Sequence, residues 1–164
     1  MNKFYLSLGS NLGDREKNLA RAMEELEKLG VKILRRSSIY ETEPVEIREQ
    51  AWFLNRAIEA ETTLQPQQLM SALLEIELQL GRRREIKYGP RIIDLDILLQ
   101  GDTIVNSPQL TIPHPKMAKR RFVLVPLAEI VPDLKHPILH RTILQLLEEC
   151  SDTSEVRATR RTIP

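Results

Sequence analysis

The stretch YGPRIIDLDILLQG runs from Tyr88 to Gly101, and most of it is typical of a buried β-strand. Its apolar residues are Ile92, Ile93, Leu95, Ile97, Leu98 and Leu99. Asp94 and Asp96 nevertheless lie in its middle, two residues apart. Aspartate is depleted in strands, and an unpaired buried carboxylate costs much free energy. The question is why a core strand carries two of them.

Side-chain alternation divides this stretch into two faces. Residues two apart in a strand point to the same side, so Asp94 and Asp96 are neighbours. Ile93, Leu95 and Ile97 point the other way, toward a core. Two neighbouring carboxylates repel each other and raise each other's pKa unless a cation lies between them. Mg²⁺ is the usual cation where a few carboxylates and substrate phosphates share the ligation.

The alternative is that the aspartates lie on the solvated face of an edge strand, which is the commoner origin of an isolated Asp-x-Asp pattern. Ile92 and Leu98 fall on the same face as the aspartates, and both are apolar. The face is therefore not generally polar, which favours the metal hypothesis.

Arginines lie close to the two aspartates in the sequence, at Arg82, Arg83, Arg84 and Arg91. The planar guanidinium suits phosphate because it makes bidentate hydrogen bonds. Enzymes that catalyse phosphoryl transfer commonly place cationic side chains beside a metal ion that is held by carboxylates. Taken alone, three consecutive arginines are more often a solvated charge run. The glycines form neither a Walker A motif nor G-x-G-x-x-G, so a nucleotide would bind through Arg, His and metal.

A third group of residues suits a flat heterocycle. Aromatic residues make up only 4% of the chain, yet Phe53 lies on the same strand face as Asn55, and Phe122 follows later. An amide beside an aromatic ring could bind the edge and the face of a heterocycle together. His114 lies between two prolines, with Arg120 nearby. The default alternatives are core packing for each Phe and a surface loop for the histidine.

Bulk composition is that of an ordinary globular protein. The chain has 164 residues, of which 41% are hydrophobic and 29% charged, and its net charge of +1 argues against binding nucleic acid through bulk charge. The single cysteine excludes an internal disulfide and is compatible with a reducing cytosol. No apolar run approaches the ~20 residues of a membrane helix, and no signal peptide is recognised. We therefore expect a cytoplasmic protein with no membrane partner.

Periodicity and turn residues predict alternating strands and helices. Strands are predicted around residues 3–8, at 31–40, at 53–62 and in the opening stretch, and helices at 14–29, 66–80, near 116 and at 141–150. The strands are half-polar, which favours an α+β sandwich with a largely antiparallel sheet. We expect a single domain over residues 1–150. Residues 151–164 are polar without an apolar period and predict a loose tail.

Taken together, these motifs resemble those of the 6-hydroxymethyl-7,8-dihydropterin pyrophosphokinase family. The strongest match is KYGPRIIDLDIL at residues 87–98, which follows the family signature [KR]-x-G-P-R-x-x-D-L-D-[IL]-[LIV]. Three further motifs occur in the family's order: LGSNLG at 8–13; SIYETEP at 38–44 with FLN at 53–55; and PH at 113–114 with Arg120 and FVLVPL at 122–127. The resemblance covers about residues 3–133. Glu46, Tyr88, Pro115 and Arg121 depart from the family pattern.

The resemblance implies a ferredoxin-like fold and an enzyme of folate biosynthesis. The reaction would move the terminal pyrophosphate of ATP onto the hydroxymethyl group of the pterin and release AMP. Two Mg²⁺ ions would be held by Asp94 and Asp96. By the same resemblance, the catalytic residues would be Arg82, Arg84, Asp94 and Asp96. The residues that bind the pterin would be Thr42, Val45, Phe53, Asn55 and Phe122. The residues that bind ATP would be Glu77, Arg84, Tyr88, Arg91, His114 and Arg120. The partners would be these small molecules, and we expect a monomer.

Two other hypotheses remain open at the level of sequence. A metal-dependent nucleotidyltransferase also uses a Gly-Ser loop and an Asp-x-Asp pair, but there the Gly-Ser normally lies shortly before the aspartates, and Gly9-Ser10 lies far from Asp94. A non-catalytic ligand-binding module would leave both the aspartates and the arginine loop without a role.

Overall fold

The computed structural model describes residues 1–81 and 89–159. Its main sheet consists of β1 (Asn2–Ser10), β2 (Lys32–Arg36), β3 (Tyr40–Thr42), β4 (Phe53–Thr62), β5 (Asp94–Leu99) and β8 (Val156–Ala158). A second, small sheet pairs β6 (Val105–Asn106) with β7 (Thr111–Ile112). The helices are α1 (Arg15–Lys28), α2 (Pro66–Gln79), the 3₁₀ helix η1 (Met117–Lys119), α3 (Arg121–Ile130) and α4 (Ile143–Glu149).

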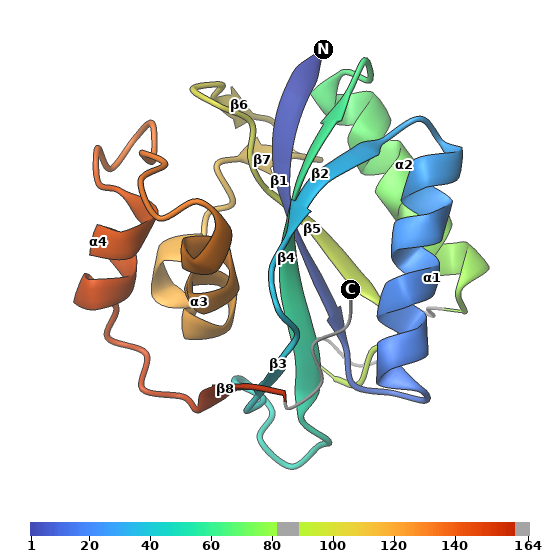
Figure 1. The fold of residues 1–164 in the computed structure, drawn as a ribbon, viewed down its shortest axis with the longest axis vertical. Helices are drawn as coiled ribbons and strands as arrows, with labels where there is room; N and C mark the ends of the chain where they lie inside the picture. The colour runs from blue at the N-terminus through green and yellow to red at the C-terminus, as the bar shows by residue number, and fades with distance from the viewer. Residues whose placement is uncertain (82–88, 160–164) are drawn as a thin grey trace.

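The elements form three layers, with the main sheet in the middle. In Figure 1, α1 and α2 lie on one side of the sheet, and α3 and α4 on the other. The strand order is β5-β1-β4-β3-β8, with β2 also paired to β4, and these strands pair in antiparallel fashion throughout. None of the described helices is long and apolar enough to cross a membrane.

The topology is ferredoxin-like. The succession β1, α1, β2, β4, α2, β5 has the βαββαβ order of that fold, and its strands lie side by side as β5-β1-β4-β2. The predicted α+β sandwich with an antiparallel sheet flanked by helices is therefore confirmed.

Local sequence signals place the helices as expected. The side chain of Asp14 accepts a hydrogen bond from the Lys17 N–H at 3.1 Å and caps α1. Pro66 opens α2, where its missing N–H costs nothing. Gln68 reaches back to accept the Gln65 N–H at 2.8 Å. These caps fix where each helix begins, and the buried apolar stripe of each helix determines which side faces the sheet.

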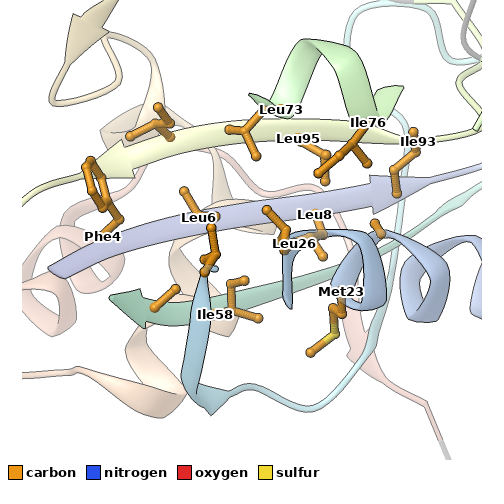
Figure 2. Packing of buried hydrophobic residues seen from close by; sticks show 14 of the residues in the cluster. Phe4, Leu6, Leu8, Met23, Leu26, Ile58, Leu73, Ile76, Ile93 and Leu95 are labelled. Carbon is orange, nitrogen blue, oxygen red and sulfur yellow. The ribbon is translucent and has the colours of Figure 1, made fainter. Parts of the chain in front are cut away.

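Each face of the sheet has its own hydrophobic core. Ile93, Leu95 and Ile97 are at most 5% exposed and pack beneath α1 and α2 with the apolar side chains of β1. Figure 2 shows Leu95 and Ile93 among these residues, close to Leu73 and Ile76 of α2. The prediction that this face of the opening strand enters a core is confirmed.

The strand predicted over residues 31–40 is divided into β2 and β3. The break is at Ser37, whose hydroxyl accepts the Ala57 N–H at 2.9 Å in place of a backbone carbonyl. The Ser37 carbonyl instead accepts the guanidinium of Arg56 at 2.6 Å, and Arg56 is only 3% exposed. A buried cation needs such an acceptor, so the carbonyl leaves the strand ladder.

The prediction of a loose tail is wrong for Val156–Ala158. These residues form β8, which pairs with β3 in the register Tyr40↔Ala158 and Thr42↔Val156. The strand has no apolar alternation because it lies at the sheet edge, with Arg157 and Ala158 exposed. Backbone pairing with β3 therefore holds it in the absence of a buried face.

The short helix predicted near residue 116 is confirmed as η1, which follows Lys116. The sequence did not predict the longer helix α3, which begins at Arg121. This places Phe122 in the first turn of a helix.

Candidate active site

A cavity of about 400 Å³ lies at the end of the sheet where β1 ends and β4 and β5 begin. Its walls include most of the residues singled out in the sequence. These are Thr42, Val45, Phe53, Asn55, Arg91, Asp94, Asp96, His114, Arg120 and Phe122. The fold therefore brings together segments that are separated by up to 80 positions in the chain, from residue 42 to residue 122. Glu43, Glu46, Gln50 and Lys116 also line the cavity.

The aspartates of β5 face this cavity. Asp94 pairs with Gly9 and Asp96 with Ser7 of β1, so both project from one side of the strand while Leu95 between them is buried. Both carboxylates are half-buried and line the same cavity. Their repulsion favours a cation at this position.

The pair fits a magnesium ion that is shared with phosphate. Among the residues that the structure describes, no group of three or more His, Cys, Asp or Glu side chains could hold a metal ion by itself. Mg²⁺ commonly takes only one or two carboxylates and completes its shell with waters and substrate phosphates. Asp94 and Asp96 therefore match the donor set of such a site.

A fixed amide forms another part of the wall. Asn55 is only 3% exposed, and its Nδ2 donates to the Thr42 hydroxyl at 2.7 Å. Gly9 lies directly against this amide, because a Cβ at Gly9 would be 2.4 Å from Asn55 Oδ1. Such a Cβ would also lie 3.7 Å from the Phe53 ring. Glycine at this position therefore leaves the space that the amide occupies, whereas the ring distance is an ordinary van der Waals contact.

Asn11 holds two sides of the cavity together. Its Oδ1 accepts the Arg91 N–H at 2.7 Å, and its own N–H donates to the Arg91 carbonyl at 3.0 Å. Its Nδ2 donates to the Gln50 side chain and to the Ala51 carbonyl, each at 2.9 Å. Asn11 belongs to the LGSNLG motif, but no property of a single asparagine in a turn indicates this double role.

His114 is presented as a neutral hydrogen-bond donor. Its Nδ1 accepts the Lys116 N–H at 3.1 Å, which assigns the ring proton to Nε2. Burial and the positive charge of Arg120 lower the pKa of His114 to about 4, and Asp94 opposes them only in part. The ring is therefore uncharged near neutral pH and can donate to an anionic oxygen through Nε2.

Phe122 and Arg120 form a combined wall at the start of α3. The guanidinium carbon of Arg120 lies 5.5 Å from the centroid of the Phe122 ring, within the range of a cation–π interaction. Both side chains also line the cavity, together with Phe53. An aromatic surface and a guanidinium cation are thus placed side by side.

A model of the 7,8-dihydro-6-hydroxymethylpterin-pyrophosphokinase (HPPK) family matches residues 5–132, which is most of this chain. The chain belongs to this family. The predicted family and enzyme class are confirmed, and the nucleotidyltransferase alternative is not favoured.

Named relatives agree with this assignment. The 2-amino-4-hydroxy-6-hydroxymethyldihydropteridine pyrophosphokinase of Bacillus subtilis is 50% identical over 127 residues, covering 77% of this chain and 76% of that protein. The enzyme of the same name from Methylorubrum extorquens is 46% identical and covers 82% of this chain and 85% of that protein. Folic acid synthesis protein fol1 of Pneumocystis carinii is 44% identical over 90% of this chain, but the chain spans only 20% of that longer protein.

A solved structure supports the fold. The chain matches a crystal structure of Plasmodium falciparum HPPK-DHPS with a TM-score of 0.74, over 90% of this chain and 45% of that one. The two sequences are 18% identical, so this likeness concerns the fold alone.

Glu77 is placed apart from the other predicted residues of this HPPK-family chain. It is only 3% exposed, does not line the cavity, and accepts the Leu95 N–H at 2.8 Å through Oε2. Its contact with ATP stays a prediction, whereas its bond to β5 is a structural feature that the sequence did not indicate. Arg82, Arg84 and Tyr88 lie outside the described residues, so their predicted roles also stay predictions.

The protonation of His114 can be tested in the metal-free protein. We expect an NMR titration to give a midpoint near pH 4, because the buried ring disfavours charge. In the unfolded chain the midpoint is about 6.5. The unfolded state therefore binds more protons between these values, and the contribution of His114 to the free energy of unfolding falls as pH drops from about 6.5 to about 4. A midpoint near 6.5 in the folded protein would contradict this description.

Proposed function

We propose that this chain transfers the terminal pyrophosphate of ATP, as one unit, to the hydroxymethyl group of 6-hydroxymethyl-7,8-dihydropterin and releases AMP. The observation that carries the proposal is one cavity that contains a carboxylate pair, two guanidinium groups and two phenylalanines beside a buried amide. The names of the relatives support the substrate. The buried Asn55 amide, which lines the cavity together with the Phe53 and Phe122 side chains, supports a flat, polar-edged molecule as the acceptor.

The pterin would lie between Phe53 and Phe122, whose rings offer faces for stacking. Asn55 and Thr42 would fix its edge, since their mutual hydrogen bond orients both groups before the ligand arrives. Val45, in the loop that follows β3, would complete this end of the site. Pre-oriented groups of this kind reduce the entropy lost on binding.

The triphosphate would be held by Arg91, Arg120 and His114. Arg91 has its backbone fixed by Asn11, and its Nη1 donates to the carbonyls of Gly89 and Pro90 at 3.0 Å. His114 would donate from Nε2 without adding charge, while the guanidinium groups would offset the negative charge of the phosphates. These contacts would hold the β-phosphorus beside the hydroxymethyl oxygen.

Asp94 and Asp96 would hold two Mg²⁺ ions, which bind phosphate oxygens and neutralise the charge that builds up during transfer. In the proposed reaction the hydroxymethyl oxygen forms a bond to the β-phosphorus, and the bond from that phosphorus to the oxygen of the AMP phosphate breaks. AMP leaves with that oxygen, and the hydroxyl proton is released. The residues of the chain contribute mainly by alignment, which is a large part of catalysis in phosphoryl transfer.

We further infer that the enzyme works in the cytoplasm as a monomer. The carboxylate pair, the guanidinium groups, the buried amide and both phenylalanines of the proposed site are all supplied by the same copy of the chain.

Replacing Asp96 with alanine tests the proposal. With ATP, Mg²⁺ and the reduced hydroxymethylpterin, we expect wild-type protein to release AMP and Asp96→Ala to do so at least about a thousandfold more slowly, because the metal loses a ligand. The matched control is Asp102→Ala, which removes an exposed carboxylate outside the cavity and should keep the wild-type rate. Release of AMP is measured by chromatography.

Three results would contradict the proposal. Wild-type protein that forms no more AMP than a metal-free reaction would refute the pyrophosphokinase activity. Release of pyrophosphate in place of AMP would instead indicate nucleotidyl transfer. A near-normal rate for Asp96→Ala would mean that the carboxylate pair is structural.

Gly9→Ala tests the role of the Asn55 amide. The new methyl group would displace Asn55 from Thr42, so we expect the KM for the pterin to rise about tenfold, which corresponds to the loss of one buried hydrogen bond. The KM for ATP should change little. In an Asn55→Ala background, where the space is empty, the Gly9 substitution should have no further effect on the pterin KM. Additive effects in the double variant would count against this contact.

A further inference from the structure

Residues 152–158, which we name the C-terminal strap, lie beyond the part of the chain that the family model matches, residues 5–132. The strap nevertheless contacts both walls of the cavity. We propose that it is a positioning element that fixes the separation of the Phe53 and Phe122 walls and thereby determines the affinity for the pterin, with Asp152 as its anchor. This inference rests on the proposed function.

The first contact is at the start of α3. Arg120, the N-cap residue, gives no side-chain cap, and Asp152 Oδ2 accepts the Arg121 N–H at 3.0 Å in its place. A carboxylate at a helix N-terminus satisfies a free N–H and interacts favourably with the helix dipole. Arg121 in turn donates to the Ser154 carbonyl at 3.2 Å. The strap therefore caps the helix whose first turn carries Phe122.

Asp152 is well fixed for this role. Its Oδ1 accepts from the Ser154 N–H at 2.9 Å and from the Ser154 hydroxyl at 2.6 Å. Burial alone would raise the pKa of Asp152, but the hydrogen bonds from Ser154 and the Arg121 N–H outweigh it and lower the pKa. The carboxylate therefore stays charged at neutral pH. Neither Asp152 nor Ser154 lines the cavity of the proposed active site, so Asp152 would act through α3.

The second contact is with β3 and the loop that follows it. The Glu43 N–H donates to the Glu155 carbonyl at 3.0 Å, and the Glu155 N–H donates to the Glu43 side chain at 3.1 Å. Val156 pairs with Thr42, which itself pairs with Phe53 and receives the hydrogen bond of Asn55. The strap thus continues the sheet next to the residues that would bind the pterin edge.

Arg157 extends this contact to the start of β4. Its guanidinium carbon lies 4.8 Å from the Trp52 ring centroid, and its Nη2 lies 3.5 Å from a Glu41 carboxylate oxygen. Trp52 immediately precedes Phe53. The side chain therefore connects the strap to β3 and to the residue that precedes β4.

The strap supplements a contact at the other end of α3. Glu129, near the helix C-terminus, accepts hydrogen bonds from the Ser38 N–H at 3.0 Å and from the Tyr40 hydroxyl at 2.5 Å. The C-terminal end of α3 is thus bonded directly to the chain before and within β3. The N-terminal end, where Phe122 lies, reaches β3 through Asp152 and the strap. Loss of the Asp152 cap would loosen the N-terminal end of α3, where Phe122 would stack on the pterin.

The test compares KM values in the full-length chain. We expect Asp152→Ala to raise the KM for the pterin about five- to tenfold, the factor that loss of a helix cap would give, with the KM for ATP changed by less than about twofold. Asp152→Asn keeps an acceptor oxygen for only one of the two backbone N–H groups that the carboxylate binds, so its pterin KM should lie between the values of wild type and Asp152→Ala. Glu148→Ala, which removes an exposed carboxylate from α4, is the matched control and should match wild type. Direct binding of the pterin, followed by its fluorescence, should show the same order.

Arg157→Ala provides a second, independent variant at the other contact. If the strap acts as one unit, Arg157→Ala should raise the pterin KM in the same direction, and the double variant with Asp152→Ala should be less than additive. A purely structural strap would lower the melting temperature and the active fraction of the Asp152→Ala variant while its pterin KM stayed at the wild-type value. That result would overturn the inference. Wild-type protein that neither binds the pterin nor forms AMP would instead refute the proposed function.

Discussion

The site depends on the hydrogen bond between Glu77 and Leu95. In the part of the chain that the structure describes, β5 is the last strand of the sheet and pairs only with β1, so its other edge has no neighbouring strand. Glu77 of α2 reaches this edge and accepts the Leu95 N–H at 2.8 Å within the buried core. Burying that N–H without a partner would cost roughly 1–3 kcal/mol. The bond therefore lets β5 keep one face in the core while Asp94 and Asp96, on either side of Leu95, face the cavity.

The functional groups of the site belong to different rigid elements of the fold. The carboxylates belong to β5, the buried amide belongs to β4, and the cation–π wall belongs to the start of α3. Asn11 connects the Arg91 backbone to the loop before β4, and Gly9 provides the close approach to Asn55. The groups are thus positioned by backbone contacts before any substrate binds, as alignment-based catalysis requires.

The residues that bear charge or rings can be located from the sequence, because their patterns are local. Period-2 alternation places Asp94 and Asp96 on one strand face, and the same alternation places Phe53 beside Asn55. The role of Asn11, the break at Ser37 and the pairing of β8 depend on partners far away in the chain. No local pattern encodes such partners, so they required the structure. The pterin and the attack on the β-phosphorus came from the family resemblance alone.

The most direct test of the central claim is a crystal structure of this chain with Mg²⁺, a non-hydrolysable ATP analogue and 6-hydroxymethylpterin. We expect metal bound to both Asp94 and Asp96 and to phosphate oxygens, with the pterin ring between Phe53 and Phe122 and its hydroxymethyl oxygen directed at the β-phosphorus. Metal bound away from the two carboxylates, or a pterin outside the Phe53–Phe122 space, would contradict it.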